Sequence, residues 1–253
     1  MGDETRNAVK LPTVSIVTPT YRRHPFLEQL LRCVRLQDYP RHLIEVVILD
    51  DSPRPPVLRA DWTDDLNVRV VHSAVRVALG EKRNRLHRYA DGEVIVCFDD
   101  DDWYPPQRVS HAVAALQASG LSLAGSSLLP IWFTGSGRMV AYGPYGPNHS
   151  CNGALAYTST YARRHKHDAG RGSGEEPSFT GNYTEPMVQL DAAKTMLAIA
   201  HQRNTVAKAE TGVGRTSLPN MVQFPGLPHQ TWRDWVTDED SRAFYRRTFD
   251  LTD

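Results

Sequence analysis

Four consecutive carboxylates, Asp99–Asp102, follow the short apolar run Val94–Phe98. The run is mostly β-branched or aromatic, which predicts a strand buried on both faces of a parallel sheet. Adjacent carboxylates at the mouth of such a strand repel one another, and their charge is costly unless a positive group shares the site. Mg²⁺ and Mn²⁺ prefer oxygen ligands of this kind. The sequence therefore predicts a divalent-cation site here, with a solvated acidic turn as the alternative.

The direction of the four side chains follows from the backbone that carries them. If the chain stays extended, Asp99 and Asp101 point to one side, and Asp100 and Asp102 point to the other. One pair would face a ligand, while the other would cap the next helix or hold the loop. Pro106 fits the first position of that helix, which we expect to run to about Gly120. In open α/β sheets, ligands bind outside the carboxyl ends of strands, where these carboxylates fall.

Composition excludes several classes of protein. The chain has 253 residues, enough for one large domain or a domain with an appendage. Acidic and basic residues balance at 29 each, so no overall field favours nucleic acid or an anionic membrane. The three cysteines have no metal-ligand spacing and indicate a reducing compartment. With no apolar leader and no transmembrane run, we expect a soluble, cytoplasmic protein without a nucleic-acid partner.

The first 120 residues alternate strand and helix patterns, which predicts an α/β fold with a mostly parallel, doubly wound sheet and helices on both faces. The expected elements are a strand over 14–21 that Pro19 ends, a helix from about 24, a strand over 44–50, a strand from 68, a helix over 79–92 and the strand 94–98.

The second half has a different pattern. Two antiparallel strands are expected around Gly135–Gly137, and a last strand over Met196–Ala200 ends at His201. The polar, Gly-rich stretch His167–Ser178 is a candidate mobile lid. From about Glu210 the chain is irregular and then rich in aromatic residues, so this C-terminal part is expected to pack on the domain or on a second subunit.

Four motifs stand in a fixed order along the chain: TPTYRR, ILDDS, GEKRN and DGEVIVCFDDDDWYPP. In this order and spacing the chain resembles the family 2 nucleotide-sugar glycosyltransferases of the GT-A fold, most closely over about residues 13–120. The segment that begins GEEPSFTGNYTEP is similar to the second half of viral and microbial members. The usual acceptor-side Glu-Asp pair is here Glu175-Glu176. No Gln-x-x-Arg-Trp motif of the processive synthases appears, so the resemblance implies transfer of a single sugar.

The resemblance and the chemistry of a sugar-nucleotide together suggest the donor contacts. Either Asp50 or Asp51 can accept a hydrogen bond from the N3–H of uracil or thymine. Arg83 suits the diphosphate or Asp99. A solvated turn and a solvated helix face are the alternatives for these residues. The expected nucleotide-sugar-binding residues are Thr18, Pro19, Thr20, Tyr21, Asp50, Asp51, Arg83, Asn84, Asp99 and Asp100.

The family's DXD pattern matches Asp99 and Asp101. By resemblance Asp101 is the direct ligand of Mn²⁺ or Mg²⁺, and Asp99 reaches ribose or a bridging group. The cation would act as a Lewis acid on the departing diphosphate. His201, at a strand end, is a further candidate metal ligand, although a lone His is more often structural. Glu176 is the expected catalytic base for the acceptor hydroxyl, with Glu175 close behind.

These expectations define a metal-dependent, inverting glycosyltransferase that moves one sugar from a UDP- or TDP-sugar to the hydroxyl of a glycan or another acceptor. A nucleotidyltransferase that forms nucleotide-sugars is the alternative, but TPTYRRHP lacks the usual Gly-rich phosphate loop. A catalytically silent nucleotide-sugar-binding module is another. The expected division is a flexible tail over 1–12, a GT-A domain over 13–208 with donor half 13–120 and acceptor half 121–208, and an extension over 209–253 that can form a homodimer.

Overall fold

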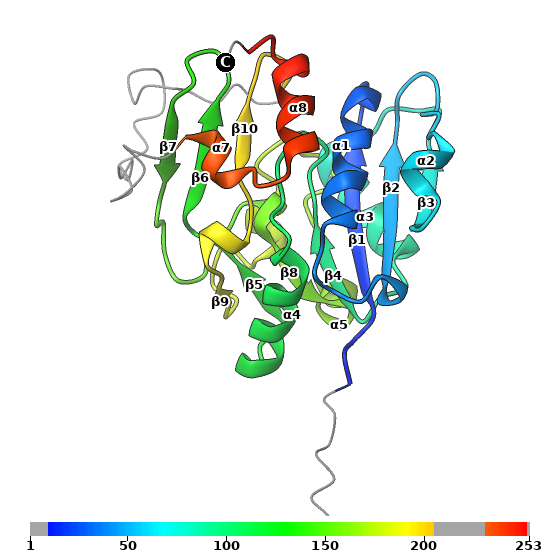
Figure 1. The fold of residues 1–253 in the computed structure, drawn as a ribbon. Helices are drawn as coiled ribbons and strands as arrows, with labels where there is room; N and C mark the ends of the chain where they lie inside the picture. Colours follow the sequence, from blue (N-terminus) through cyan, green and yellow to red (C-terminus); the bar gives the residue numbers. More distant parts are fainter. Residues whose placement is uncertain (1–9, 205–230, 252–253) are drawn as a thin grey trace, which may run out of the picture.

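A computed structural model describes residues 10–204 and 231–251 (Figure 1). Its main sheet has the strand order β3-β2-β1-β4-β8-β5-β9. The first four of these are parallel to their neighbours, β8 is antiparallel to β4 and β5, and β9 is parallel to β5. The mostly parallel α/β sheet is confirmed. The strands are β1 Val14–Thr20, β2 Ile44–Asp50, β3 Asn67–His72, β4 Val94–Cys97, β5 Leu123–Gly125, β8 Ala156–Thr158 and β9 Val188–Gln189.

A smaller sheet has the order β10-β6-β7. Strands β6 (Leu129–Phe133) and β7 (Met139–Tyr142) are antiparallel, as their sequence pattern predicts. Strand β10 (Ala198–Ala200) is parallel to β6. Leu197, directly before β10, exchanges backbone hydrogen bonds with Trp103. This contact brings the residues after β10 to the end of β4, where the acidic run lies.

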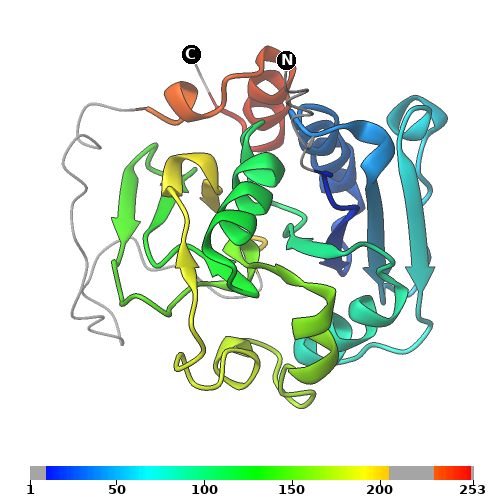
Figure 2. The same cartoon turned by 90° about the horizontal axis from the view of Figure 1, so that it is seen from below.

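Helices cover both faces of the main sheet, and Figure 2 shows the sheet between the two layers of helices. Helices α1, α4 and α8 share a core with Val14 and Ile16 of β1. Helices α3 and α5 pack on the other face, against Val17 and Ile95. The helices are α1 His24–Arg35, α2 Ala60–Thr63, α3 Leu79–Tyr89, α4 Arg108–Ser119, α5 Ser159–Arg164, α6 Glu176–Phe179, α7 Trp232–Trp235 and α8 Glu239–Thr248, with 3₁₀ turns at Arg41–Leu43, Asn152–Ala154 and Ala192–Lys194.

The prediction that Pro19 ends the first strand is wrong, because β1 runs on to Thr20 with Pro19 opposite Leu49 of β2. The β1–β4 ladder ends at Val17, whose carbonyl accepts from Phe98 N–H. Alternate residues of a strand bond toward the same neighbour, so Pro19 faces the side where that ladder has already ended. Its missing N–H therefore removes no ladder bond.

Two helix boundaries also differ from the prediction. Helix α4 begins at Arg108 instead of Pro106, because Arg108 N–H first closes a turn to the carbonyl of Pro105. Its predicted end at Gly120 is confirmed by a left-handed φ of 67°. Helix α3 ends at Tyr89 instead of Gly92. Gly92 N–H donates to Ser15 Oγ at 2.7 Å, and a Cβ there would lie 2.5 Å from the Ser15 nitrogen.

The described part of the C-terminal extension lies against the domain. Helix α8 lies beside α1 in Figure 1. Between the two helices, Gln29 Nε2 donates to Ser241 Oγ at 2.9 Å. Trp232 of α7 stacks on Trp132 of β6, with ring centroids 4.6 Å apart. A homodimer through this extension remains a prediction. The predicted tail 1–12 and extension 209–253 lie partly outside the described residues.

Candidate active site

The acidic run Asp99–Asp102 is a turn, because β4 ends before it. The predicted alternation of the side chains is wrong. Asp100 and Asp101 contact the same Arg23 guanidinium, at 2.9 and 2.5 Å. Of the two roles predicted for the other pair, Asp102 holds the loop, since its Oδ1 accepts from Ile199 N–H at 2.7 Å. The first turn of α4 is capped by Gln37 instead, whose Oε1 accepts from Val109 N–H at 3.0 Å. The backbone turn lets neighbouring carboxylates reach partners that a strand would place on opposite faces.

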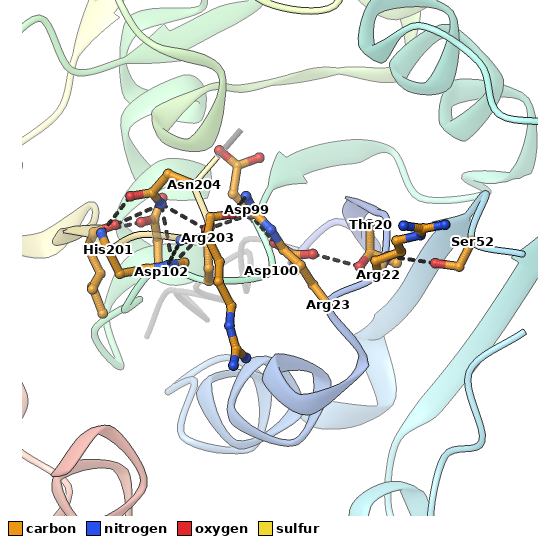
Figure 3. Close-up of polar contacts among 12 residues, drawn as sticks. Thr20, Arg22, Arg23, Ser52, Asp99, Asp100, Asp102, His201, Arg203 and Asn204 are labelled. Atoms are coloured by element: carbon orange, nitrogen blue, oxygen red, sulfur yellow. Dashed lines mark hydrogen bonds and ion pairs between the residues drawn. The ribbon is translucent and has the colours of Figure 1, made fainter. Parts of the chain in front are cut away.

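Asp100 lies at the inner side of the turn, where it is buried. It accepts hydrogen bonds from Thr20 Oγ1 at 2.6 Å and from Arg23 at 2.9 Å (Figure 3). Burial and the neighbouring charge of Asp101 together raise the pKa of Asp100 to about 7. The Arg23 guanidinium lies between the two acids, and a bound cation would relieve the remaining repulsion that raises the pKa of Asp100.

Asp101 meets two side chains from the segment after β10. His201 Nε2 and Asn204 Nδ2 each lie 3.0 Å from Asp101 Oδ2. The backbone N–H of Arg203 donates to His201 Nδ1 at 3.1 Å, so the proton of a neutral imidazole lies on Nε2. In this arrangement His201 donates to Asp101 and orients it. The structure thus brings the predicted pair together, while direct ligation of a metal by His201 remains a prediction.

The residues of the turn fit a hard cation that arrives with a diphosphate. Within the described ranges, no group of three or more His, Cys, Asp or Glu could hold a metal ion by itself. Mg²⁺ is usually bound by one or two carboxylates together with substrate phosphates and water, and Mn²⁺ favours the same oxygen ligands. Asp101 and Asp99 are the carboxylates predicted to ligate such a cation, and this stays a prediction; the side chain of Asp99 is 30 % exposed.

Arg83 joins the two acidic parts of the site. Its Nη2 donates to Asp99 Oδ1 at 3.0 Å, and its Nε donates to Glu175 Oε1 at 2.7 Å. Arg83 and Glu175 are both buried. The predicted contact between Arg83 and Asp99 is therefore present, and the same guanidinium also reaches the predicted acceptor side.

Asn152 holds both glutamates, and the sequence reasoning missed it. Its Nδ2 donates to Glu175 Oε1 at 2.9 Å, and its backbone N–H donates to Glu176 Oε1 at 3.2 Å. Its own Oδ1 is 2.9 Å from His167 Nε2, which therefore carries the imidazole proton. Asn84 pairs in both directions with the backbone of His167. Asn152 stands in the Gly-, Pro- and Asn-rich stretch at 143–153, where the sequence has no helix or strand periodicity.

The two glutamates differ in their exposure to solvent and in their hydrogen bonds. Glu175 is 2 % exposed and its Oε1 already accepts from Arg83 and Asn152. Glu176 is half-buried, and among residues 10–204 and 231–251 no hydrogen bond reaches its Oε2. Burial raises the pKa of Glu176, and the neighbouring charge of Glu175 raises it further. Among the described residues neither Oε2 accepts a hydrogen bond, so Glu176 differs from Glu175 in being more exposed and in not being ion-paired to Arg83.

The predicted base pocket contains two buried acids that differ in their hydrogen bonds. Both oxygens of Asp51 are engaged, by Lys82 Nζ at 2.5 Å and by Val77 N–H at 2.9 Å. Asp50 accepts from Ser52 on Oδ1 only, and no hydrogen bond to its Oδ2 is found in the described part of the chain. Lys82 was also missed, although it stands inside the GEKRN motif. Of the two acids, Asp50 thus has the oxygen without a hydrogen bond, although Asp50 is fully buried and His72 Nε2 lies 3.9 Å from that oxygen.

The end of β1 supplies the aromatic part of this pocket. Tyr21 is half-buried, with the Arg76 guanidinium 4.0 Å from its ring centroid. Thr18 and Thr20 are buried beneath it in β1. The predicted donor residues at the ends of β1, β2 and β4 therefore lie along one edge of the sheet.

No described helix has the length and apolarity needed to cross a membrane.

Comparison with known proteins finds a family match over part of the chain. Residues 15–133 match the model of glycosyl transferase family 2. TarS of Staphylococcus aureus, a poly(ribitol-phosphate) β-N-acetylglucosaminyltransferase, is 28% identical over 103 residues, 40% of this chain and 18% of TarS. WcaA of Escherichia coli, a putative colanic acid biosynthesis glycosyl transferase, is 29% identical over 109 residues, 42% of this chain and 38% of WcaA. The chain thus spans much less than two thirds of these relatives.

Solved structures share the fold. The mannosyltransferase PcManGT of Pyrobaculum calidifontis, in complex with GDP-Man and Mn²⁺, aligns with a TM-score of 0.59 at 17% identity, over 78% of this chain and 59% of its own. TarS residues 1–349 with UDP-GlcNAc align with a TM-score of 0.59 at 18% identity, over 76% and 60%. The predicted GT-A fold and the resemblance to family 2 are confirmed.

Proposed function

We propose that this chain, whose residues 15–133 match the glycosyl transferase family 2 model, moves one sugar from a nucleotide-sugar to an acceptor hydroxyl. One observation carries the proposal: Arg83 joins Asp99 of the donor edge to Glu175 of the acceptor side in one buried site. A transferase needs both halves within reach of one anomeric carbon. The nucleotide-sugars in the TarS and PcManGT complexes support the donor class.

On the donor side, Asp101 and Asp99 would hold Mn²⁺ or Mg²⁺ together with the diphosphate. When bound, the cation supplies Lewis-acid stabilisation of the departing diphosphate. His201 and Asn204 keep Asp101 in place through hydrogen bonds to Oδ2. Arg83 orients Asp99 and can donate to phosphate oxygens, since a guanidinium offers several N–H groups in one plane.

On the acceptor side, Glu176 takes the proton of the attacking hydroxyl on Oε2. Its raised pKa brings it closer to that of an effective base at neutral pH. Asn152 fixes Oε1 from the backbone, and Glu175 remains bound to Arg83. Direct attack by the acceptor, opposite the departing diphosphate, inverts the anomeric carbon.

The nucleotide is proposed to be UDP or TDP. Asp50 Oδ2 can accept the N3–H that uracil and thymine present, while the Tyr21 ring offers a stacking surface beside Arg76. Adenine has no N–H at the corresponding ring nitrogen. Guanine has an N1–H but is a larger base, so a pocket fitted to a pyrimidine disfavours it.

A donor panel tests the function. The chain is incubated with UDP-Glc, UDP-GlcNAc, TDP-Glc and GDP-Man, with Mn²⁺ or with EDTA, and both slow donor hydrolysis and the shift in Tm are recorded. We expect a UDP- or TDP-sugar to be hydrolysed and to raise Tm only with Mn²⁺. Glu176→Gln is the matched control, because it should keep the Tm shift and lose hydrolysis. Absence of any donor effect would contradict the proposal, and formation of nucleotide-sugar from a sugar phosphate and UTP would indicate a nucleotidyltransferase.

A further inference from the structure

The imidazole of His201 is packed by two phenyl rings from distant parts of the chain. Phe26 of α1 stacks on it at a centroid distance of 5.1 Å and an interplanar angle of 18°. Phe249, the residue directly after α8, stacks at 5.2 Å and 29°. The side chain of His201 is only 3 % exposed. The ring that reaches Asp101 is thus held on its faces as well as at its two nitrogens.

Phe249 is itself fixed by α8. It stacks parallel to Tyr245, with an interplanar angle of 4° and a centroid distance of 6.0 Å. The Tyr245 hydroxyl donates to the backbone carbonyl of Asp102 at 3.4 Å. Helix α8 therefore contacts the acidic turn twice, directly through Tyr245 and indirectly through Phe249 and His201.

Fixing the plane of the imidazole has a specific consequence. The Nε2–H of His201 points at Asp101 Oδ2 from 3.0 Å, and hydrogen bonds weaken steeply when the donor rotates away from the acceptor. Residues behind a metal-binding side chain set its orientation and thereby the affinity of the site. A smaller side chain at position 249 would let the ring tilt, because one of its two stacking partners would be lost.

We propose that Phe249 is a positioning residue, through which the C-terminal helix α8 sets the affinity of the Asp101 site for Mn²⁺. This inference rests on the proposed function, since it needs Asp101 to be a metal ligand. It lies outside the family 2 match, which ends at residue 133. It assigns the C-terminal extension a part in the active site rather than in packing alone.

Phe244 provides a matched control on the same helix. It also packs on Phe26, edge-on at 6.2 Å and 67°, and it also contacts Tyr245. Among the ring contacts of the described residues, Phe244 makes none with His201. Phe244→Leu therefore removes comparable apolar packing and leaves the imidazole stacked. Phe249→Tyr is the conservative variant, because residue 249 lines a cavity of about 520 Å³ that can accept a hydroxyl.

The experiment is a Mn²⁺ titration of the full chain at fixed UDP, followed by electron paramagnetic resonance of the free ion. We expect Phe249→Leu to weaken Mn²⁺ binding about tenfold, as outer-sphere changes do at metal sites. Phe249→Tyr and Phe244→Leu should stay within about twofold of the unmodified chain on the same scale. Without metal, the ring protons of His201 should move toward random-coil chemical shifts in Phe249→Leu only. If Phe249→Leu unfolds, Phe249→Met replaces it in both measurements.

Two outcomes separate this inference from the proposed function. If Asp101→Asn loses Mn²⁺ but Phe249→Leu binds it like Phe244→Leu, the positioning role is overturned and the metal site stands. If Asp101→Asn binds Mn²⁺ normally, the metal part of the proposed function fails, and the inference fails with it. A tenfold loss in Phe249→Leu alone, with Tm values alike in the two Leu variants, supports the inference.

Discussion

The acidic residues at the end of β4 and those at the start of α6 belong to one site but are held in different ways. Asp99–Asp102 are neighbours in sequence, and their carboxylates contact the residue before α1, a residue of α3, and residues in and after β10. Glu175 and Glu176 share one partner, Asn152, which contacts both. A cluster that spreads suits a diffuse charge such as a cation with a diphosphate. Glutamates that one residue, Asn152, joins to each other suit a proton acceptor that must be oriented.

This comparison predicts the largest effect on the acceptor side. Glu176→Gln should lower turnover roughly 10²- to 10⁴-fold, because general-base catalysis contributes about that much. Donor and Mn²⁺ affinity should stay unchanged, since Glu176 makes no described contact with the acidic turn. The measurement is kcat at saturating donor and acceptor, beside calorimetric donor affinity. Near-normal turnover in both Glu176→Gln and Glu175→Gln would place the base elsewhere, with Asp191 the next residue to test.

Asp50 should contribute to nucleotide binding in the base pocket. Asp50→Asn should weaken UDP binding about tenfold or more, because a hydrogen bond to a charged group contributes about 1.5–3 kcal/mol. In the unmodified chain, UDP and TDP should compete better than GDP and ADP. Competition binding with the four diphosphates measures both effects. Preference for GDP would overturn the pyrimidine assignment and leave the transferase proposal standing.

The glutamate pair should also determine how kcat depends on pH. The pKa of Glu176 is raised by burial and by Glu175, so it loses its proton at a higher pH than an ordinary glutamate. Since a base must be deprotonated to act, kcat should rise with pH through this pKa. Glu175→Gln removes the neighbouring charge and should move the acidic limb to lower pH. An unmoved limb in a pH–rate series would show that Glu176 does not set it.

The smallest expected effect concerns His167, which supports Asn152. Burial lowers the pKa of His167 to about 2, so the folded protein keeps it neutral while the unfolded chain protonates near 6.5. The unfolded state then binds the extra proton, and His167 should contribute a fall of about 1.4 kcal/mol in the free energy of unfolding per pH unit below 6.5, in addition to that of His87, whose pKa burial also lowers. His167→Gln keeps a donor for Asn152 and should lose that slope, whereas the exposed His42→Gln should retain it. Urea unfolding at pH 6 and pH 4.5 gives the comparison, and equal slopes in all three proteins would contradict it.

The donor edge could be predicted from sequence because its signals are local. Buried strands end in polar residues at the ends of β1, β2 and β4, and parallel strands bring those ends to one edge. His201 was found in the same way, as a polar residue at a strand end. Two other partners of the acids, Arg23 and Asn204, were not predicted, because they lie about 80 and 100 residues away in sequence from the acidic run.

The acceptor side could not be built in this way. Glu175 and Glu176 entered through resemblance to a family, and nothing in their own stretch shows that Glu175 is buried by Arg83. Asn152 stands in a 3₁₀ turn within a Gly- and Pro-rich segment, where periodicity carries no signal. The alternation of Asp100 and Asp101 failed for a related reason, since it assumed a strand where the chain turns. Sequence patterns predict regular backbone, whereas the acidic run and the segment around Asn152 are turns.

Calorimetric titration of UDP, with and without Mn²⁺, tests the central claim most directly when the unmodified chain is compared with Asp101→Asn. We predict that Mn²⁺ strengthens UDP binding in the unmodified chain and has no effect in Asp101→Asn, with circular dichroism showing the same fold in both. Equal enhancement by Mn²⁺ in the two proteins would contradict the assignment of the metal to the end of β4.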